Sequence, residues 1–336
     1  MNRIIVLGAT GNIGRQLCSY LGEMNLKGFS IIALCGKSSD GKQVSVGETT
    51  VKANYEPNFA YKKDDIVISC LRAVMIEQIA ENITEAGAVL IDTSSHFRAD
   101  SDKMLIVPEV NGDLINGSLS DYSGKIITSP NCVAAPLVIA LNALHKLCGI
   151  KRVVISTYQA VSGAGAMAMD ELFSQSKKMF ESAFPDPQVF EKQISFNCLP
   201  KIGEFSAHGK TGEEEKVGLE LQKIMNLPDL KVSATCVRVP VFACHGMSVN
   251  VELEQGFQIS EAQKAIQEAS PLVRFSEEGE YQTQVETAAL DEIFVSRFRR
   301  DYSVDNGLNF WLVSDNLRKG GALNAAQILK QLLSIV

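Results

Sequence analysis

The sequence predicts an α/β protein that begins with a doubly wound parallel sheet and continues with an α+β region built on a mixed sheet. Three observations predict this. A glycine-rich turn at residues 8–14 joins an apolar run to a helical pattern, and apolar runs then alternate with helical patterns to about residue 130. From Lys151 onward, long β-rich runs appear. Alternation predicts parallel strands with covering helices, whereas successive strands predict antiparallel or mixed pairing.

Length and composition exclude several classes of protein. The 336 residues are enough for two domains, and a hydrophobic fraction of 46% supplies their cores. A net charge of −7 argues against nucleic-acid binding. The apolar runs are shorter than a membrane span, and the immediate N-terminal strand leaves no room for a signal peptide, so we expect a cytoplasmic protein. The spacing of the cysteines and histidines predicts neither a metal site nor a disulfide framework.

The first strand, turn and helix have the order of a Rossmann-like unit. Arg3–Leu7 is the expected strand and Ile13–Leu21 the expected helix, with glycines at 8, 11 and 14 between them. Such glycines allow the backbone to approach a pyrophosphate, which then lies at the helix N-terminus. The spacing is GxxGxxG rather than GxGxxG, and a tight turn without a cofactor is the alternative.

The end of the second expected strand, Ser30–Cys35, favours NADP over NAD. An NAD site usually carries an acidic residue there for the ribose 2′-hydroxyl. Here Lys37, Ser38 and Ser39 come first, and a cation with two hydroxyls suits a 2′-phosphate. Asp40 is the counter-evidence, and an ordinary polar turn is the alternative.

Two further strands, at 65–69 and 88–92, flank a helix expected from about Met75 to Ala86. The polar segment 92–98 follows the later strand, at the end of a parallel sheet where ligands gather. Its Arg98 suits an oxyanion. Its His96 reads as a packed or surface residue.

Cys132 is the candidate nucleophile. An apolar strand ends in Ser-Pro-Asn-Cys at 129–132, and a long apolar helix pattern follows at once. A helix N-terminus lowers a thiol pKa and so favours the reactive thiolate. A buried structural cysteine is the alternative.

Residues 232–253 read as one extended run that carries Arg238 and His245. An arginine in an apolar strand is costly unless it meets an anion, which is either a substrate carboxylate or a salt-bridge partner. His245 gains interest only as a base for Cys132. Pro240 predicts an edge or bulge nearby. A helix is expected from Glu213 to Met225, where Glu214 and Glu215 suit an ordinary first turn.

Seven motifs run along the chain. They are GATGNIG at 8–14, IDTSSHFR at 91–98, VPEVN at 107–111, SPNC at 129–132, STYQAVSGAG at 156–165, VSATCVRVPVF at 232–242 and VSDNLRKGGALNAAQI at 313–328. Together these segments resemble aspartate-semialdehyde dehydrogenases of the bacterial type along essentially the whole chain. The resemblance implies an NADP-binding Rossmann domain over 1–130, rejoined by a C-terminal helix at 316–336, and a catalytic and dimerisation domain over 131–315. It further implies a homodimer or tetramer.

The resemblance also implies residue roles. Cys132 is the nucleophile, His245 the acid/base and Gln159 the residue that orients the intermediate. Substrate binding falls to Arg238 for the α-carboxylate, Glu213 for the amino group, Arg98 and Lys216 for phosphate, and Asn131. The cofactor contacts implied by the turn, the second strand and the resemblance are Gly8, Thr10, Gly11, Asn12, Ile13, Lys37, Ser38, Ser39, Ser162, Gly163 and Asn316.

The implied reaction is NADPH-dependent reduction of β-aspartyl phosphate to aspartate semialdehyde through a cysteine thioester, with inorganic phosphate released. Two other functions stay open. One is an N-acetyl-γ-glutamyl-phosphate reductase, whose cysteine motif reads Pro-Gly-Cys. The other is a non-catalytic NADP-binding sensor. Residues 69–73, Ser-Cys-Leu-Arg-Ala, depart from the family's Gly- and Ser-rich pattern.

Overall fold

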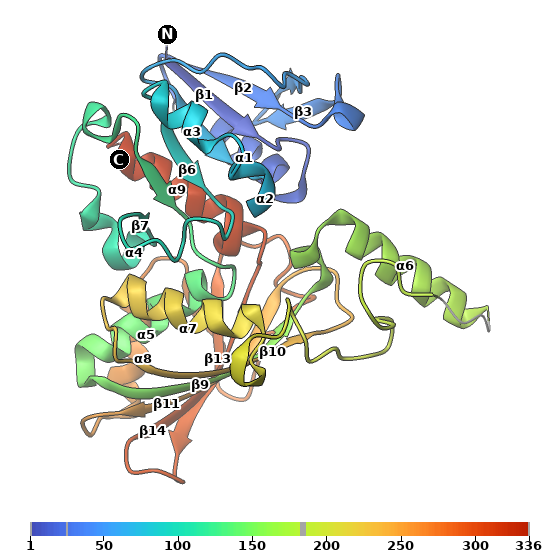
Figure 1. Cartoon of the computed structure of the whole chain (residues 1–336). Helices are drawn as coiled ribbons and strands as arrows, with labels where there is room; N and C mark the ends of the chain where they lie inside the picture. The colour runs from blue at the N-terminus through green and yellow to red at the C-terminus, as the bar shows by residue number, and fades with distance from the viewer. Residues whose placement is uncertain (1, 25, 182–185, 335–336) are drawn as a thin grey trace. The chain divides into compact units, whose positions relative to one another are not determined.

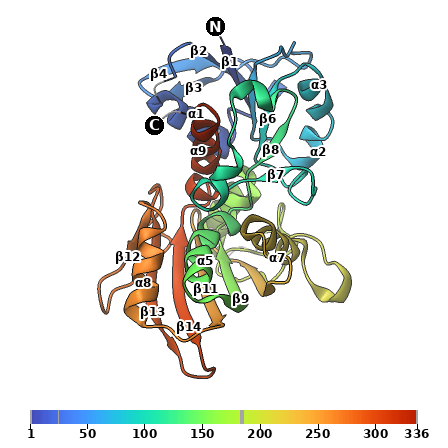
Figure 2. The same ribbon diagram turned by 90° about the vertical axis from the view of Figure 1, so that its left-hand side faces the viewer.

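The structure is a computed structural model that describes residues 2–24, 26–181 and 186–334. They form two compact units, Met1–Asn131 with Gly321–Val336, and Cys132–Gly320 (Figures 1 and 2). We expected the first break after residue 130 and the return at 316. The chain returns later because Asp315 starts a turn that stays in the second unit: its carboxylate accepts hydrogen bonds from the Leu317 and Ala289 amides.

The N-terminal unit contains a fully parallel six-stranded sheet in the order β2-β1-β5-β6-β8-β7. This confirms the doubly wound prediction, because β1 has β2 on one side and the later strands on the other. A small hairpin, β3 with β4, accompanies it. The strands are β1 Asn2–Leu7, β2 Phe29–Leu34, β3 Gln43–Val46, β4 Thr49–Lys52, β5 Ile66–Ser69, β6 Val89–Asp92, β7 Met104–Leu105 and β8 Ile126–Thr128.

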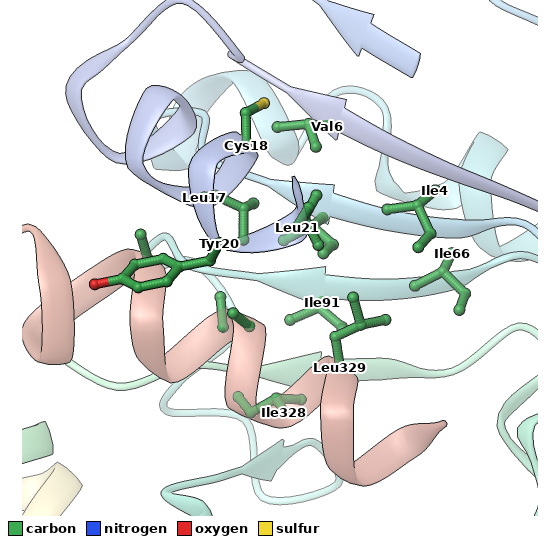
Figure 3. Packing of buried hydrophobic residues seen from close by; sticks show 14 of the residues in the cluster. Ile4, Val6, Leu17, Cys18, Tyr20, Leu21, Ile66, Ile91, Ile328 and Leu329 are labelled. Atoms are coloured by element: carbon green, nitrogen blue, oxygen red, sulfur yellow. The ribbon is translucent and has the colours of Figure 1, made fainter. Parts of the chain in front are cut away.

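Helices cover both faces of this sheet. Helix α1 (Asn12–Glu23) and the C-terminal helix α9 (Leu323–Leu332) pack on one face, and the apolar cluster between them is drawn in Figure 3. The other face is covered by α2 (Ala73–Ile76) and α3 (Ala80–Glu85). Helix α4 (Pro108–Asn111) is a single turn.

The single helix expected from Met75 to Ala86 is therefore wrong. The backbone tightens at Ile79, whose amide donates to the Ile76 carbonyl three residues back, and this divides the segment. The expected C-terminal helix is also shorter. Arg318–Ala322 forms a π-helical turn before α9, and residues 335–336 lie outside the described residues.

The second unit contains a mixed six-stranded sheet in the order β10-β9-β11-β14-β13-β12, as predicted. Helices α5, α7 and α8 lie on one face (Figures 1 and 2), while α6 extends from the end of β9 beyond a short 3₁₀ turn. The bounds are α5 Ala134–Cys148, β9 Ile150–Gln159, α6 Ala166–Phe180, α7 Gly212–Met225, β10 Lys231–Arg238, β11 His245–Leu253, α8 Ile259–Glu268, β12 Val273–Phe275, β13 Ile293–Asp301 and β14 Gly307–Ser314.

The extended run expected over 232–253 is in fact two strands, so that prediction is wrong. The chain leaves the sheet at Val239-Pro240 and re-enters at His245, after Cys244 adopts a left-handed φ of +69°. Pro240 lacks an amide hydrogen and cannot continue the ladder. Because β10 and β11 flank β9 on opposite sides, this interruption brings Arg238 and His245 to the same end of the sheet.

Candidate functional site

The candidate site is built on one row of residues at the end of β9. Gln159 is the last residue of β9, and it pairs with Arg238 on β10 and with His245 on β11. All three are almost completely buried. Parallel pairing on one side and antiparallel pairing on the other therefore place a cation, a carboxamide and an imidazole side by side.

Cys132 meets this row through His245. Its Sγ lies 3.2 Å from the Nε2 atom of His245, although the two residues are far apart in the sequence. Cys132 immediately precedes Val133, the N-cap of α5, and so lies at the start of this helix as the sequence predicted. The helix packs on the same sheet as β9 and β11. The thiol thus lies beside a helix N-terminus and an imidazole nitrogen, a pairing typical of nucleophilic cysteines.

The tautomer of His245 follows from its second hydrogen bond. The Ala160 amide donates to Nδ1 at 3.0 Å, so Nδ1 carries no proton. In the neutral ring the proton is then on Nε2, directed at the Cys132 sulfur. Burial and, next, the positive charge of Arg238 lower the pKa of His245 to about 3. The ring is therefore neutral at physiological pH and serves as a hydrogen-bond donor to the sulfur.

Arg238 is a buried cation with unused donors. Its Nη1 donates to the Ala160 carbonyl at 2.7 Å, its only hydrogen-bond acceptor among the residues that the structure describes. Burial lowers the pKa of Arg238, and the nearby charge of Glu213 opposes that shift. A β-carbon at Gly163 would lie 3.1 Å from Nη1, so the glycine leaves room for this side chain. An anionic ligand would satisfy the remaining donors.

Helix α7 supplies an acidic group to the same place. Glu213 lies in the first helical turn and accepts a hydrogen bond of 3.0 Å from Gln159 Nε2. Its two neighbours have structural partners, as their positions suggested. Glu214 caps the helix at Thr211 and accepts from the Cys236 amide, and Glu215 accepts from Ser206. Lys216 follows on α7.

The predicted nicotinamide contacts lie beside this row. Ser162 and Gly163 form a 3₁₀ turn directly after β9. Asn316 exchanges hydrogen bonds with the Ser162 hydroxyl and accepts one from the Cys244 amide, next to His245. Asn316 is thus engaged in holding two site segments, and a cofactor contact for it stays a prediction.

The predicted glycine turn of the N-terminal unit has a tight backbone that suits a dinucleotide site. Gly8 has a left-handed φ of +76°, and a β-carbon at Gly14 would lie only 2.2 Å from the Gly8 carbonyl oxygen. Gly11, which follows Thr10 and precedes Asn12 and Ile13, is the N-cap of α1 and has no side chain that could cap the helix. These features fit a pyrophosphate.

The region after β2 suits the adenosine end of such a cofactor. A cavity of about 640 Å³ opens at the carboxyl ends of β1 and β2, lined in part by Gly8, Gly36 and Tyr55. Lys37, Ser38 and Ser39 form a partly exposed 3₁₀ turn there. The carboxylate of Asp40, the counter-evidence to NADP, accepts a hydrogen bond from the Tyr55 amide and so has a structural partner.

The remaining predicted residues, Arg98 and Asn131, belong to the N-terminal unit. The Arg98 guanidinium donates to the carbonyls of Ser129 and Thr93, which orients it at the carboxyl ends of β6 and β8. Asn131 is the residue before Cys132. Their roles toward a substrate stay predictions.

Sequence reasoning missed three residues that support the site. The Ala160 amide sets the His245 tautomer, and Thr157 donates to Gln159 Oε1. Gly320 lies against Cys132: a β-carbon there would be 2.8 Å from the Cys132 Cβ and 2.9 Å from its carbonyl oxygen. Thr157 and Gly320 each lie within one of the motifs given above, so the sequence did mark their segments. The Ala160 amide carries no sequence signal, because a backbone amide does not depend on the side chain.

We predict that Gly320→Ala displaces the Cys132 backbone. The added methyl group meets backbone and Cβ atoms that cannot rotate away, so we expect a loss of about 1–3 kcal/mol in unfolding free energy and slower alkylation of Cys132 by iodoacetamide. Gly256→Ala is the matched control, because its β-carbon would meet nothing closer than 3.9 Å. Equal alkylation rates and unfolding temperatures in the two variants would contradict the prediction.

We also predict that His245 makes stability fall with acidification. Its folded pKa, about 3, lies below its ordinary value of 6.5, so the unfolded chain binds the proton first as the pH falls. Stability should decrease by up to about 1.4 kcal/mol per pH unit below 6.5. Denaturant titrations between pH 5 and 6.5, a range above the pKa values of most carboxylates, measure this slope. His245→Gln should flatten it, whereas the exposed His208→Gln should not; an unchanged slope in His245→Gln refutes the assignment.

Known proteins are similar to this chain along nearly its whole length. A family model described as "Semialdehyde dehydrogenase, NAD binding domain" matches residues 3–118, and one described as "Semialdehyde dehydrogenase, dimerisation domain" matches residues 141–319. An aspartate-semialdehyde dehydrogenase from Rickettsia conorii is 41% identical over 98% of this chain and 97% of its own length. One from Aquifex aeolicus is 39% identical over 98% of each chain.

A solved structure agrees with them. Aspartate semialdehyde dehydrogenase II from Vibrio cholerae, complexed with ASA, is 34% identical, with a TM-score of 0.93 over 99% of this chain and 98% of that one. Two domain models matched in order, and relatives of this identity along nearly the whole length, show that the chain belongs to the aspartate-semialdehyde dehydrogenase family.

Proposed function

We propose that this chain reduces β-aspartyl phosphate to aspartate semialdehyde, with NADPH as the reductant and inorganic phosphate as the second product. This step would serve the biosynthesis of lysine through diaminopimelate, of threonine and of methionine. The observation that carries the proposal is the contact of Cys132 with His245 beside Arg238 and Glu213. A nucleophile thus lies next to a cation and an anion, which are the charges that a free amino acid needs.

The nucleophile would be the Cys132 thiolate. It attacks the acyl carbon of the substrate, a carbon–sulfur bond forms, and the carbon–oxygen bond to phosphate breaks. The resulting thioester accepts a hydride, which a carboxylate does not. NADPH, when bound, supplies that hydride. Collapse of the reduced adduct then breaks the carbon–sulfur bond and restores the thiolate.

His245 would act through its Nε2 hydrogen. The ring begins neutral with Nδ1 engaged by Ala160, so Nε2–H is its one donor. It donates to the sulfur in the resting site and to the oxyanion that develops on the substrate. The thiolate is regenerated when the alkoxide collapses, and the proton consumed overall is taken up by the departing phosphate.

Substrate recognition would use both charges of the site. The free donors of Arg238 bind the α-carboxylate, and Glu213 binds the amino group. Gln159, between them, orients the acyl intermediate. Arg98 and Lys216 bind the phosphate, and Asn131 contacts the substrate next to the nucleophile.

The cofactor would be held by the N-terminal unit. The glycine turn at 8–14 takes the pyrophosphate, and Lys37 with Ser38 and Ser39 takes the 2′-phosphate of NADP. The hydrogen bond from the Tyr55 amide to Asp40 favours NADP, because that carboxylate already has a partner. Ser162, Gly163 and Asn316 would lie near the nicotinamide.

An N-acetyl-γ-glutamyl-phosphate reductase is the weaker alternative. An acetylated substrate has no ammonium group, so it would leave the Glu213 carboxylate without its ligand. A non-catalytic sensor would have no use for a thiol held 3.2 Å from an imidazole. Turnover of aspartate semialdehyde and of N-acetylglutamate semialdehyde, measured with the same preparation, separates these functions.

We predict that Cys132→Ser lowers the rate of NADP reduction by aspartate semialdehyde by about a thousandfold or more, with NADP binding retained. The assay is run with and without inorganic phosphate, since phosphate must release the acyl group. Cys198→Ser, an exposed cysteine outside the site, is the matched control. Full activity of Cys132→Ser, or phosphate-independent turnover in the unchanged chain, would contradict the mechanism.

We further propose a homodimer formed through the uncovered face of the second sheet, with a tetramer as the larger alternative. Helices α5, α7 and α8 occupy the opposite face (Figures 1 and 2). Ser248 is exposed on the uncovered face, and Tyr158 packs there on Trp311 with ring centres 5.4 Å apart. The family model that matches this region is described as a dimerisation domain.

We predict that Ser248→Arg yields a monomer, because a bulky charge would be buried at the centre of that interface. The matched control is Ser260→Arg, an exposed serine on α8. Light scattering after size exclusion gives the mass of each. A dimeric Ser248→Arg would exclude this face as the interface.

We propose the cytoplasm as the location. All eight cysteines are free, as expected in a reducing compartment. Among the described residues, no helix combines the length and apolarity that crossing a bilayer requires.

A further inference from the structure

Thr157 lies beneath the candidate site and has no assigned role. It is on β9, two residues before Gln159 and therefore on the same face of the strand. Its side chain is completely buried, and its hydroxyl donates to Gln159 Oε1 at 2.9 Å. A neutral hydroxyl in this position is either a satisfied core group or a support for the carboxamide above it.

The donor and acceptor roles around Gln159 leave no second arrangement. The Glu213 carboxylate accepts hydrogen bonds only, so the amide NH₂ of Gln159 must face it. The carboxamide oxygen then faces Thr157, whose hydroxyl must be the donor. Thr157 thus holds the amide in the one orientation that presents its NH₂ group to the site.

The backbone holds Thr157 in place from the next strand. Thr157 pairs with Cys236 on β10, and both side chains are completely buried. The donors consequently run in one direction, from the Thr157 hydroxyl to Gln159 and from the Gln159 amide to Glu213.

We propose that Thr157 is a positioning residue, which acts on the reaction by fixing the Gln159 carboxamide between Glu213 and the reacting acyl group. The inference rests on the proposed function for its catalytic effect. When a substrate ammonium group binds Glu213, the hydrogen bond from Gln159 competes with it. Because Thr157 still holds the carboxamide oxygen, the NH₂ group stays directed at the site while that hydrogen bond weakens.

The experiment compares Thr157→Val, which removes the hydroxyl at nearly constant volume, with Thr157→Ser, which keeps it. We expect Thr157→Val to lower kcat for aspartate semialdehyde about 3- to 10-fold with little change in the KM for NADP, as for the loss of one hydrogen bond. Thr157→Ser should restore most of the rate. Equal rates in the two variants would overturn the proposal.

A double-mutant cycle tests whether the effect passes through Gln159. In a Gln159→Leu background, Thr157→Val should cause no further loss of rate, because the group that it positions is gone. The shifts in melting temperature of the two single variants should likewise not add up to the shift of the double variant. A full additional loss of rate would show that Thr157 acts elsewhere. Additive shifts in melting temperature would refute the coupling between Thr157 and Gln159, whatever the substrate is. If the chain without substitutions did not oxidise aspartate semialdehyde, the proposed function would be refuted instead.

Discussion

The site depends on the way in which β9 is paired at its last residue. Parallel pairing with β10 and antiparallel pairing with β11 place Arg238, Gln159 and His245 in one row. The ladder hydrogen bonds that form the sheet therefore also position the reactive groups. A shift of one residue in either strand would turn a side chain to the opposite face, so the register of the sheet also sets the chemistry.

The electrostatics of the row follow from burial. Burial of His245 and, next, the positive charge of Arg238 lower the pKa of this histidine, so the imidazole stays neutral. A neutral ring with Nδ1 occupied by the Ala160 amide can only donate from Nε2. The arrangement thus favours negative charge at the sulfur and at the substrate oxygen. The buried Arg238 guanidinium has one acceptor among the described residues, and it carries a desolvation cost that an anionic substrate would offset.

Much of this could be predicted from the sequence. The glycine turn, the alternation of strands and helices, and the position of Cys132 before α5 are local patterns, and each appeared in the structure. The break between β10 and β11 was missed, because Pro240 signalled an irregularity without saying that the chain leaves the sheet. The divided helix at Ile79 contains neither glycine nor proline. Thr157 donates to a residue only two positions away, but Glu213 on a distant helix decides which way that residue faces. Gly320 lies against Cys132, far away in the sequence, so only the fold discloses either role.

The most direct test of the account is to trap the acyl group on the enzyme. The chain is mixed with aspartate semialdehyde and NADP in the absence of phosphate, quenched, digested and examined by mass spectrometry. The account predicts one equivalent of NADPH formed in a burst and an aspartyl group on the peptide that contains Cys132. A burst with the aspartyl group on another residue, or oxidation that continues with Cys132 unmodified, would contradict it.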